Sequence, residues 1–157
     1  MESRPAYFMV VSSRTHHGVV AELTKGAIAV LENSGATYER VEVATLFEIP
    51  AAIRFAIKGH EFFSARRRFD GYIALGCSIK SGCAFHEEQL FSQCLTGLSD
   101  VSLEHSLAFG NGVFFADTSD QALAVALADG LSNLGGEAAN TCLEMLGMKH
   151  KFGMKPR

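Results

Sequence analysis

The sequence alternates between short apolar stretches and longer segments whose apolar residues recur at helical spacing. The first stretch, residues 6–11 (AYFMVV), contains no charged side chain, as expected for a strand buried on both faces of a parallel sheet. Further strands are predicted over residues 37–43, 72–76 and 107–115. A helical pattern follows each strand. This repeated order favours an α/β fold in which an open, mostly parallel sheet lies between two layers of helices.

Turn and cap residues mark the ends of the predicted helices. Gly35 suits the left-handed position just after a first helix, and Pro50 suits the first turn of a second helix, which we expect to end near Gly59. The polar residues 60–69 would connect that helix to the next strand. Three later helices are predicted. The first covers residues 85–98, the second follows a cap formed by Thr118 or Ser119 with Gln121, and the third covers residues 136–146.

The length of 157 residues suits one domain, predicted over residues 1–157. Hydrophobic residues make up 48% of the chain and charged residues 20%, a composition that excludes a disordered protein. The net charge of −3 argues against nucleic acid or an anionic membrane as a partner. No apolar run approaches the ~20 residues that span a bilayer, and residues 1–5 do not resemble a signal peptide. We therefore expect a cytoplasmic protein.

The four cysteines show no C-x-x-C spacing, so a disulfide framework is not expected. Most of them should be buried, free thiols. Cys83 is the candidate for a reactive thiol, because it lies three residues before His86. The sequence contains no H-x-x-x-H pair and no Cys/His quartet, so no metal site is predicted.

Parallel α/β proteins bind ligands at the carboxyl ends of their strands. Three loops are expected at that edge, over residues 12–18, 44–50 and 77–86. The third leads into a helix whose first N–H groups would face an anion such as phosphate, and Gly82 would let the backbone come close to it. His86, in the first turn of that helix, could move protons because imidazole titrates near neutral pH. The alternative is a surface or capping histidine.

Three other features carry two interpretations each. Glu48 precedes Pro50 and could place a carboxylate at a helix N-terminus as part of a site, or could be an ordinary first-turn acid. Phe47 could stack on a planar ring or belong to the core. The run Arg66–Arg68 is predicted to form a solvated loop, with a phosphate or nucleic-acid contact as the alternative.

Several segments match one family in order and spacing. They are TLFEIP at residues 45–50, DGYIALG at residues 70–76 followed by Ile79-Lys80, GCAFH at residues 82–86 and NLGGEAANTCLEM at residues 133–145. Together they resemble the segments of lumazine synthases, and the resemblance runs from about Phe8 to Met148. It implies a flavodoxin-like, three-layer fold with a four-stranded sheet.

The resemblance also implies an activity. Lumazine synthases are transferases of riboflavin biosynthesis that condense 5-amino-6-(D-ribitylamino)uracil with 3,4-dihydroxy-2-butanone 4-phosphate to 6,7-dimethyl-8-ribityllumazine. They use no metal or redox cofactor. Their active site lies between the subunits of a homopentamer, which can assemble into larger shells, and the first strand here is long enough to join a neighbour's sheet. The implied partners are two small-molecule substrates and further copies of the chain, with neither nucleic acid nor membrane.

Carried over position by position, the resemblance implies roles for individual residues. His86 becomes the catalytic residue that transfers protons. The phosphate loop would consist of Gly82, Cys83 and Ala84. The positions that would contact the substrates are Thr15, Leu46, Phe47, Glu48, Cys77, Ser78, Ile79 and Asn111. Residues 77–79, in the third loop, would do so through their backbone. Asn111 stands where the family often has a phenylalanine that reaches from the neighbouring subunit.

The chain departs from the family at positions that bind phosphate. Ala84 stands where the family has a threonine, and Val125 stands where an arginine usually clamps the phosphate. We therefore expect backbone N–H groups of residues 82–85 to hold this anion. Two alternatives stay open, namely a homologue that binds a flavin or lumazine ring with weak catalysis, and a structural shell protein.

Overall fold

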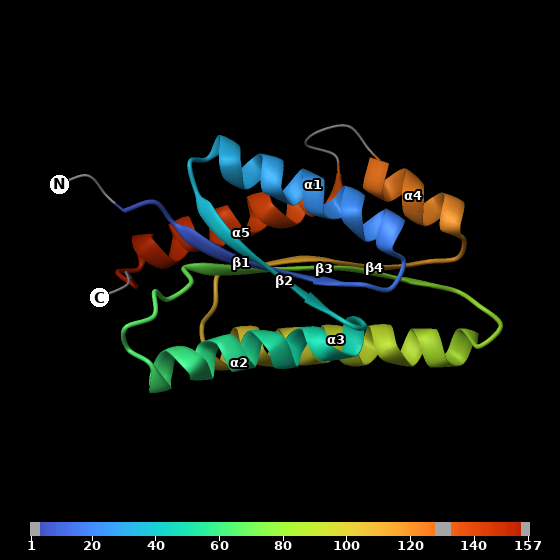
Figure 1. Cartoon of the computed structure of the whole chain (residues 1–157), viewed down its shortest axis with the longest axis horizontal. Helices are drawn as coiled ribbons and strands as arrows, with labels where there is room; N and C mark the ends of the chain where they lie inside the picture. Colours follow the sequence, from blue (N-terminus) through green and yellow to red (C-terminus); the bar gives the residue numbers. More distant parts are fainter. Residues whose placement is uncertain (1–3, 128–132, 155–157) are drawn as a thin grey trace.

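A four-stranded parallel sheet forms the middle of the molecule (Figure 1). The structure is a computed structural model that describes residues 4–127 and 133–154. The strands are β1 (Tyr7–Ser13), β2 (Thr37–Val43), β3 (Gly71–Ile79) and β4 (Phe109–Ala116), in the spatial order β2-β1-β3-β4. The order changes direction between β1 and β3, so the crevice that such sheets use for ligands lies at the carboxyl ends of these two strands.

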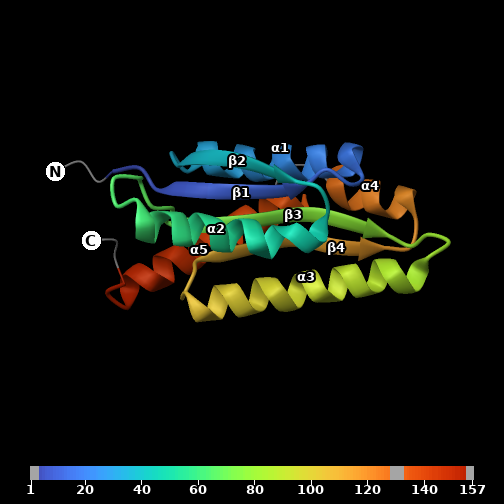
Figure 2. The ribbon, with the colours of Figure 1, turned by 60° about the horizontal axis from the view of Figure 1, so that its bottom comes forward.

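Helices cover both faces of the sheet, as Figures 1 and 2 show. One layer contains α1 (His17–Asn33), α4 (Ser119–Leu127) and α5 (Leu134–Lys151), and the other contains α2 (Ile49–Phe62) and α3 (Ala84–Glu104). A short 3-10 helix, η1 (Leu46–Glu48), precedes α2. The predicted three-layer α/β fold is confirmed. Across the described ranges, no helix combines the length and apolar content that crossing a bilayer requires.

The first elements follow the predicted pattern closely. Residues 8–13 of β1 are all buried, because this central strand has neighbours on both sides and helices on both faces. β2 covers the predicted residues 37–43 and is only partly buried, as suits an edge strand. α1 ends at Asn33, and Gly35 just after it has a φ of 74°, which glycine adopts without steric cost.

β3 and α2 are longer than predicted. Cys77, Ser78 and Ile79 belong to β3 and not to the expected loop, because the strand stays buried and paired with β4 to its end. α2 continues past Gly59 to Phe62. Glycine costs a helix interior only about 1 kcal/mol, and the next residue, His60, is buried.

The later helices are also longer than predicted. α3 runs to Glu104, and α5 begins at Leu134 and ends at Lys151. The predicted cap of α4 is present, since Thr118 Oγ1 accepts a hydrogen bond from the Gln121 N–H at 3.2 Å. The Gln121 side chain accepts from the N–H of the residue before the cap, also at 3.2 Å.

The place of β1 in the sheet contradicts the prediction that it joins a neighbour's sheet. β1 pairs with β2 on one side and β3 on the other, so its backbone groups are used within the chain. The free edges of the sheet belong to β2 and β4.

The layer of α1 and α5 packs backbone against backbone. A Cβ atom on Gly110 of β4 would overlap the backbone of Ala138 in α5, and one on Gly135 of α5 would overlap the backbone of Leu23 in α1. Only glycine permits these approaches.

Candidate active site

Two of the three predicted loops are joined at the carboxyl edge of the sheet. The Thr15 hydroxyl, after β1, donates a hydrogen bond to the carbonyl of Ala44, after β2, at 3.0 Å. The Arg14 N–H donates to the Val43 carbonyl at 2.9 Å. These two bonds bring Thr15 next to the segment that leads into η1.

η1 is held by a capping box between Thr45 and Glu48. Glu48 Oε2 accepts from the Thr45 N–H at 2.8 Å and from its hydroxyl at 2.6 Å, and the Thr45 hydroxyl accepts from the Phe47 N–H at 3.2 Å. The hydrogen bond from the Thr45 side chain lowers the pKa of Glu48 below its usual value. The carboxylate thus stays charged and in place, while Oε1 takes no part in these bonds.

The two neighbours of Glu48 in η1 point in different directions. Leu46 is buried in the core between the sheet and the layer of α2 and α3. The Phe47 side chain is 59% exposed, so its interpretation as a core residue is wrong. An exposed aromatic ring beside a ligand edge offers a surface on which a planar molecule can stack.

The end of β3 presents free backbone beside η1. β1 pairs with β3 only as far as Leu75, whereas β4 pairs with it up to Ile79. In the described chain, residues 77–79 therefore have no strand partner on the side of β1. A Cβ atom on Gly76 would overlap Leu46, so this glycine lets η1 lie close to β3. Cys77, Ser78 and Ile79 are buried as whole residues in the single chain, so a ligand would reach their backbone only in the space beside η1.

The buried Ser13 hydroxyl lies beside the same glycine. It is 3.1 Å from the position of a Cβ on Gly76, and it has no hydrogen-bond partner in the structure. Sequence reasoning missed this residue. The signal for it was a serine at the carboxyl end of a buried strand, the edge at which parallel sheets bind ligands.

Glu87, a second residue that sequence reasoning missed, joins α3 to β3. The Ser78 hydroxyl donates to Glu87 Oε2 at 2.5 Å, and Glu87 lies in the first turn of α3. The sequence signal was an acid in the first turn of a helix that follows a strand ending in serine. This carboxylate places a negative charge near the start of α3.

His86 lies at the outer end of the site. It is exposed, and its side chain makes no hydrogen bond to any described residue. The buried residues of α3 begin with Cys94, which packs in the same cluster as Leu46. Eight residues of helix separate His86 from Cys94, or about 12 Å along the axis. The next residue, Glu87, contacts Ser78 of β3, so His86 lies near the carboxyl end of β3 with its side chain exposed.

The predicted phosphate loop is open to solvent. Cys83 is the N-cap of α3 and makes no side-chain cap, and its N–H donates to the Ser81 hydroxyl at 3.3 Å. A Cβ atom on Gly82 would meet nothing within 4 Å. Phe85 is 76% exposed, and the side chain of Ala84 lies outside the described part of the structure. The start of α3 thus presents a helix N-terminus that an anion can approach.

Asn111 lies apart from the other predicted contacts. It sits in β4 opposite Ala74, and its side-chain oxygen accepts from the Val113 N–H at 3.0 Å. β4 is three strand spacings, about 14 Å, from β2. Val125 is on α4, on the other face of the sheet. One chain therefore brings Thr15, η1 and the end of β3 together, but not Asn111 or Val125.

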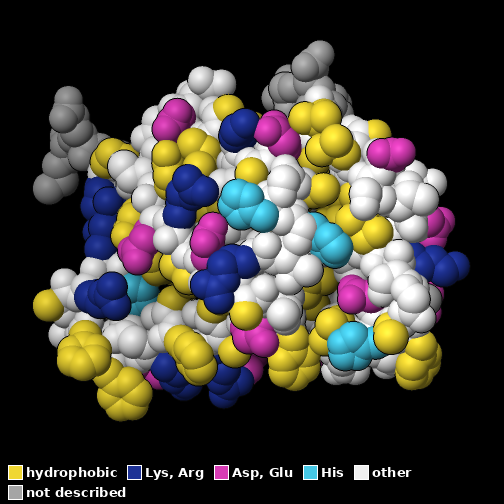
Figure 3. Space-filling view, turned by 45° about the vertical axis from the view of Figure 1, so that its right-hand side comes forward, with side chains coloured by type: hydrophobic (Ala, Val, Ile, Leu, Met, Phe, Trp, Pro, Cys, Tyr) yellow, Lys and Arg dark blue, Asp and Glu magenta, His cyan; other side chains and the backbone are white. Residues whose placement is uncertain are grey.

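The thiols and histidines are dispersed. Cys77, Cys94 and Cys142 are buried, and burial raises the pKa of each thiol to about 12, whereas Cys83 is exposed. Among the residues that the structure describes, no three His, Cys, Asp or Glu side chains come together as metal ligands. Figure 3 shows the histidines at separate places on the face near the carboxyl edge.

The arginine run is not a uniformly solvated loop. Arg66 and Arg68 are exposed, as expected. Arg67 is half-buried: its guanidinium lies 4.5 Å from the centre of the Tyr7 ring and bonds the Pro5 carbonyl and the Thr37 hydroxyl. For Arg67 the solvated-loop prediction is wrong, because this cation–π contact ties the loop to the start of β1.

Comparison with known proteins points to one family. The sequence profile described as 6,7-dimethyl-8-ribityllumazine synthase matches residues 5–150. A protein of that name from Paramagnetospirillum magneticum is 32% identical over 95% of this chain and 98% of its own length. Those from Bartonella bacilliformis and Nitrobacter winogradskyi are each 37% identical over 94% of this chain, and over 92% and 88% of their own lengths. The chain belongs to the 6,7-dimethyl-8-ribityllumazine synthase family.

Proposed function

We propose that the chain condenses 5-amino-6-(D-ribitylamino)uracil with 3,4-dihydroxy-2-butanone 4-phosphate to 6,7-dimethyl-8-ribityllumazine, with His86 as the catalytic residue. The observation that carries the proposal is the arrangement at the carboxyl edge in a chain of this family. There, an exposed aromatic ring and a fixed carboxylate lie beside the end of β3, whose residues 77–79 are not paired with β1. The start of α3, with its exposed histidine, lies near the end of β3.

Each part suits a portion of the substrates. Phe47 would stack on the pyrimidinedione ring, and the backbone of residues 77–79 would bond its polar edge. Glu48 Oε1, which the capping box leaves available, would accept hydrogen bonds from the ribityl hydroxyls. Most of the rate acceleration would come from holding the two substrates together.

His86 has the freedom that proton transfer requires. Formation of the imine, loss of phosphate and ring closure each move a proton, and an imidazole can take and return it near neutral pH. The His86 side chain has no partner among the described residues and can face a bound substrate. The phosphate would be held by the first N–H groups of α3, at residues 82–85, because Val125 has no donor.

The site would be completed by a second copy of the chain. His86 is exposed, and Asn111 lies in β4, at the edge of the sheet opposite β2, so one copy's β4 edge would have to approach another copy's loops. The layer of α2 and α3 also exposes large apolar side chains, visible along the lower edge of Figure 3. They include Phe62, Phe63 and Leu103. We expect a homo-oligomer built from pentamers.

One observation favours a second candidate function, the binding of a flavin or lumazine ring with weak catalysis. The Glu87 carboxylate lies in the first turn of α3, where its negative charge would repel a bound phosphate. Val125 stands where the family has an arginine, so no guanidinium would balance this repulsion. The loss of such a charged hydrogen bond costs about 1.5–3 kcal/mol. We expect a raised KM for the butanone phosphate and a smaller effect on kcat.

The test is to mix the oligomeric protein with both substrates and to follow lumazine absorbance and phosphate release. We expect turnover that His86→Ala lowers by about 10²–10⁴-fold while the unfolding temperature stays the same. The matched control is His150→Ala, a histidine in the last turn of α5, away from the carboxyl edge of the sheet. Tight ring binding without turnover would select the second candidate. Wild-type turnover in the His86 variant would remove this residue from the mechanism.

A further inference from the structure

A cavity of about 290 Å³ lies at the amino end of the sheet, and the proposed reaction does not use it. The last turns of α2, the residues that follow α3 and the start of β3 surround it. Ile57 of α2 and Leu107, which precedes β4, supply apolar walls. From residue 72 to residue 79, β3 extends over about 23 Å. The cavity is therefore remote from the loops of the candidate active site.

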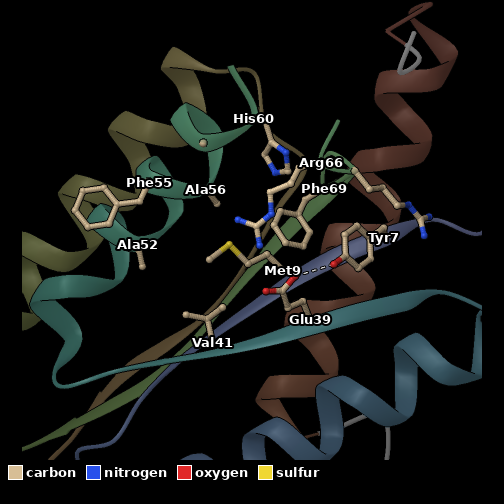
Figure 4. Close-up of a pocket in the computed structure, with 12 residues that line it drawn as sticks. Tyr7, Met9, Glu39, Val41, Ala52, Phe55, Ala56, His60, Arg66 and Phe69 are labelled. Carbon is tan, nitrogen blue, oxygen red and sulfur yellow. Dashed lines mark hydrogen bonds between the residues drawn. The ribbon is translucent and has the colours of Figure 1, made fainter. Parts of the chain in front are cut away.

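His60 and Phe69 line both this cavity and a larger one between α2 and β1 (Figure 4). In the larger cavity the polar groups contact one another. The Tyr7 hydroxyl donates to Glu39 at 2.8 Å, and the Arg67 guanidinium lies over the Tyr7 ring. The polar groups of the smaller cavity are used less fully within the chain.

Tyr72 of β3 brings an unpartnered hydroxyl to the smaller cavity. The residue is only 4% exposed and lines the cavity. In the described part of the chain its hydroxyl forms no hydrogen bond, and it is not one of the polar atoms there that are closed off from solvent. The hydroxyl is therefore reached through the cavity. Burial raises the pKa of Tyr72 to about 12, so the group stays protonated at neutral pH and can donate to a ligand.

Two cations lie at the same cavity. Lys149 of α5 is partly buried, and Arg68, in the segment before β3, is exposed. Among the described residues, neither takes part in an ion pair. The charge of Arg68 acts on the pKa of Tyr72, which places the guanidinium near the hydroxyl. The three donors belong to different elements, so they would contact a bound anion from different sides.

The two acids that line the cavity are engaged by other groups. Glu61 pairs with Lys58 at 3.0 Å, and Asp70 Oδ2 accepts from the Tyr7 N–H at 2.8 Å. With Lys58 included, three cations face two acids, so the surroundings of the cavity keep a positive charge. The two histidines that line it can only add to this charge.

We propose that this cavity binds a phosphate group, either as the free ion or as the ester of a small molecule. The Tyr72 hydroxyl donates to one phosphate oxygen, and Lys149 and Arg68 contact the others. A phosphate ester carries a charge of about −1.5 to −2 at neutral pH, which two cations match, and its oxygens accept from several directions. A carboxylate has less charge and fewer acceptors and should bind more weakly. The proposal does not rest on the proposed reaction, because none of the three donors belongs to the candidate active site.

The experiment titrates the oligomeric full chain with sodium phosphate at constant ionic strength, with NMR labels on the tyrosine rings and the isoleucine methyl groups. The chain has three tyrosines, so each ring signal can be assigned. We expect the Tyr72 and Ile57 signals to shift together and to saturate, while Tyr38 of β2 stays unchanged. The absence of a saturable shift would overturn the proposal, as would a Tyr38 shift as large as that of Tyr72.

Two further ligands identify the chemistry. Acetate that binds as tightly as phosphate would overturn the assignment to phosphate. Phenyl phosphate distinguishes the two sources, and either result supports the site. Tighter binding than that of free phosphate would identify an ester as the ligand, because its ring can pack on Ile57 and Leu107. Equal binding would identify the free ion.

Conservative variants test the donors. Tyr72→Phe, followed through Ile57, and Lys149→Gln should each weaken phosphate binding by about 10–100-fold with the unfolding temperature unchanged. Arg68→Gln should weaken it by about 2–5-fold, because this guanidinium is exposed. The matched control is Lys151→Gln, an exposed lysine in the last turn of α5 that does not line the cavity. Phosphate binding that survives both Tyr72→Phe and Lys149→Gln would overturn the proposal.

Discussion

The two faces of the sheet are built differently. On the face of α1 and α5, helices and strands approach so closely that Gly110 and Gly135 have no room for a Cβ atom. On the face of α2 and α3, the helices leave a cavity of about 380 Å³, and Phe62 and Leu103 on their outer surfaces are 80% and 77% exposed. The first face is complete within one chain, whereas the second leaves space and apolar surface for other molecules.

This difference indicates which substitutions should affect stability and which should affect association or binding. Close backbone contacts cannot relax, so changes on the first face should lower the free energy of unfolding. Exposed side chains on the second face contribute little to a single chain. Changes there should act on the oligomer or on ligands.

Gly110→Ala should have the largest effect. Its new methyl group would overlap the Ala138 backbone, so β4 and α5 would have to separate, at a cost of about 3 kcal/mol or more. Gly147→Ala is the matched control, because a Cβ there meets nothing within 4 Å and alanine favours the helix. Urea unfolding of both variants measures the difference. Equal stabilities would mean that the first face is not rigid.

Asn133→Ala should come next. Its side chain accepts from the N–H groups of Gly135 and Gly136, and donates to the carbonyl groups of Glu22 at 3.0 Å and Ala126 at 2.5 Å. Its loss would leave a helix start and two carbonyls without partners, at a cost of about 2–4 kcal/mol. Asn33→Ala, at the exposed end of α1, should change stability by about 0.5 kcal/mol or less.

Phe62→Ser tests the second face. We expect the free energy of unfolding of a single chain to change little, and association to weaken by about 1.5–3 kcal/mol if the ring is buried between subunits. Sedimentation over a concentration series measures this. Phe152→Ser, which removes a similarly exposed ring from the end of α5, is the control. Dissociation by the control alone would place the interface on the other face.

His60→Gln should give the smallest effect, visible as a change in pH dependence. Burial lowers the pKa of His60 below 6.5. A hydrogen bond with the Arg66 backbone and the charge of Glu39 raise this pKa, while the charges of Arg66 and Arg68 lower it further. Between the folded and unfolded pKa values the unfolded chain binds more protons, so stability is full above pH 6.5 and falls as the pH decreases. In the variant, the free energy of unfolding should depend less steeply on pH between pH 5 and 7. An unchanged slope would mean that His60 does not titrate on unfolding.

The sequence by itself determined the strands and helices and their order. The apolar run of β1, the limits of β2 and the stop at Gly35 were all predictable, because each depends on residues that are neighbours in the chain. The same local signals predicted that Thr15 and η1 would lie together at the carboxyl edge, since parallel strands end on one side of a sheet.

Tertiary structure decided which residues that are distant in the sequence contact one another. Phe47 is exposed, Arg67 covers the Tyr7 ring, and Ser78 bonds Glu87, although the local sequence around each residue allowed other outcomes. The separation of Asn111 from the loops follows from the strand order, which no local pattern encodes. Local propensity acts over one or two turns of chain, whereas these contacts depend on how whole elements pack. The sequence therefore determined which elements form, and packing decided which side chains meet.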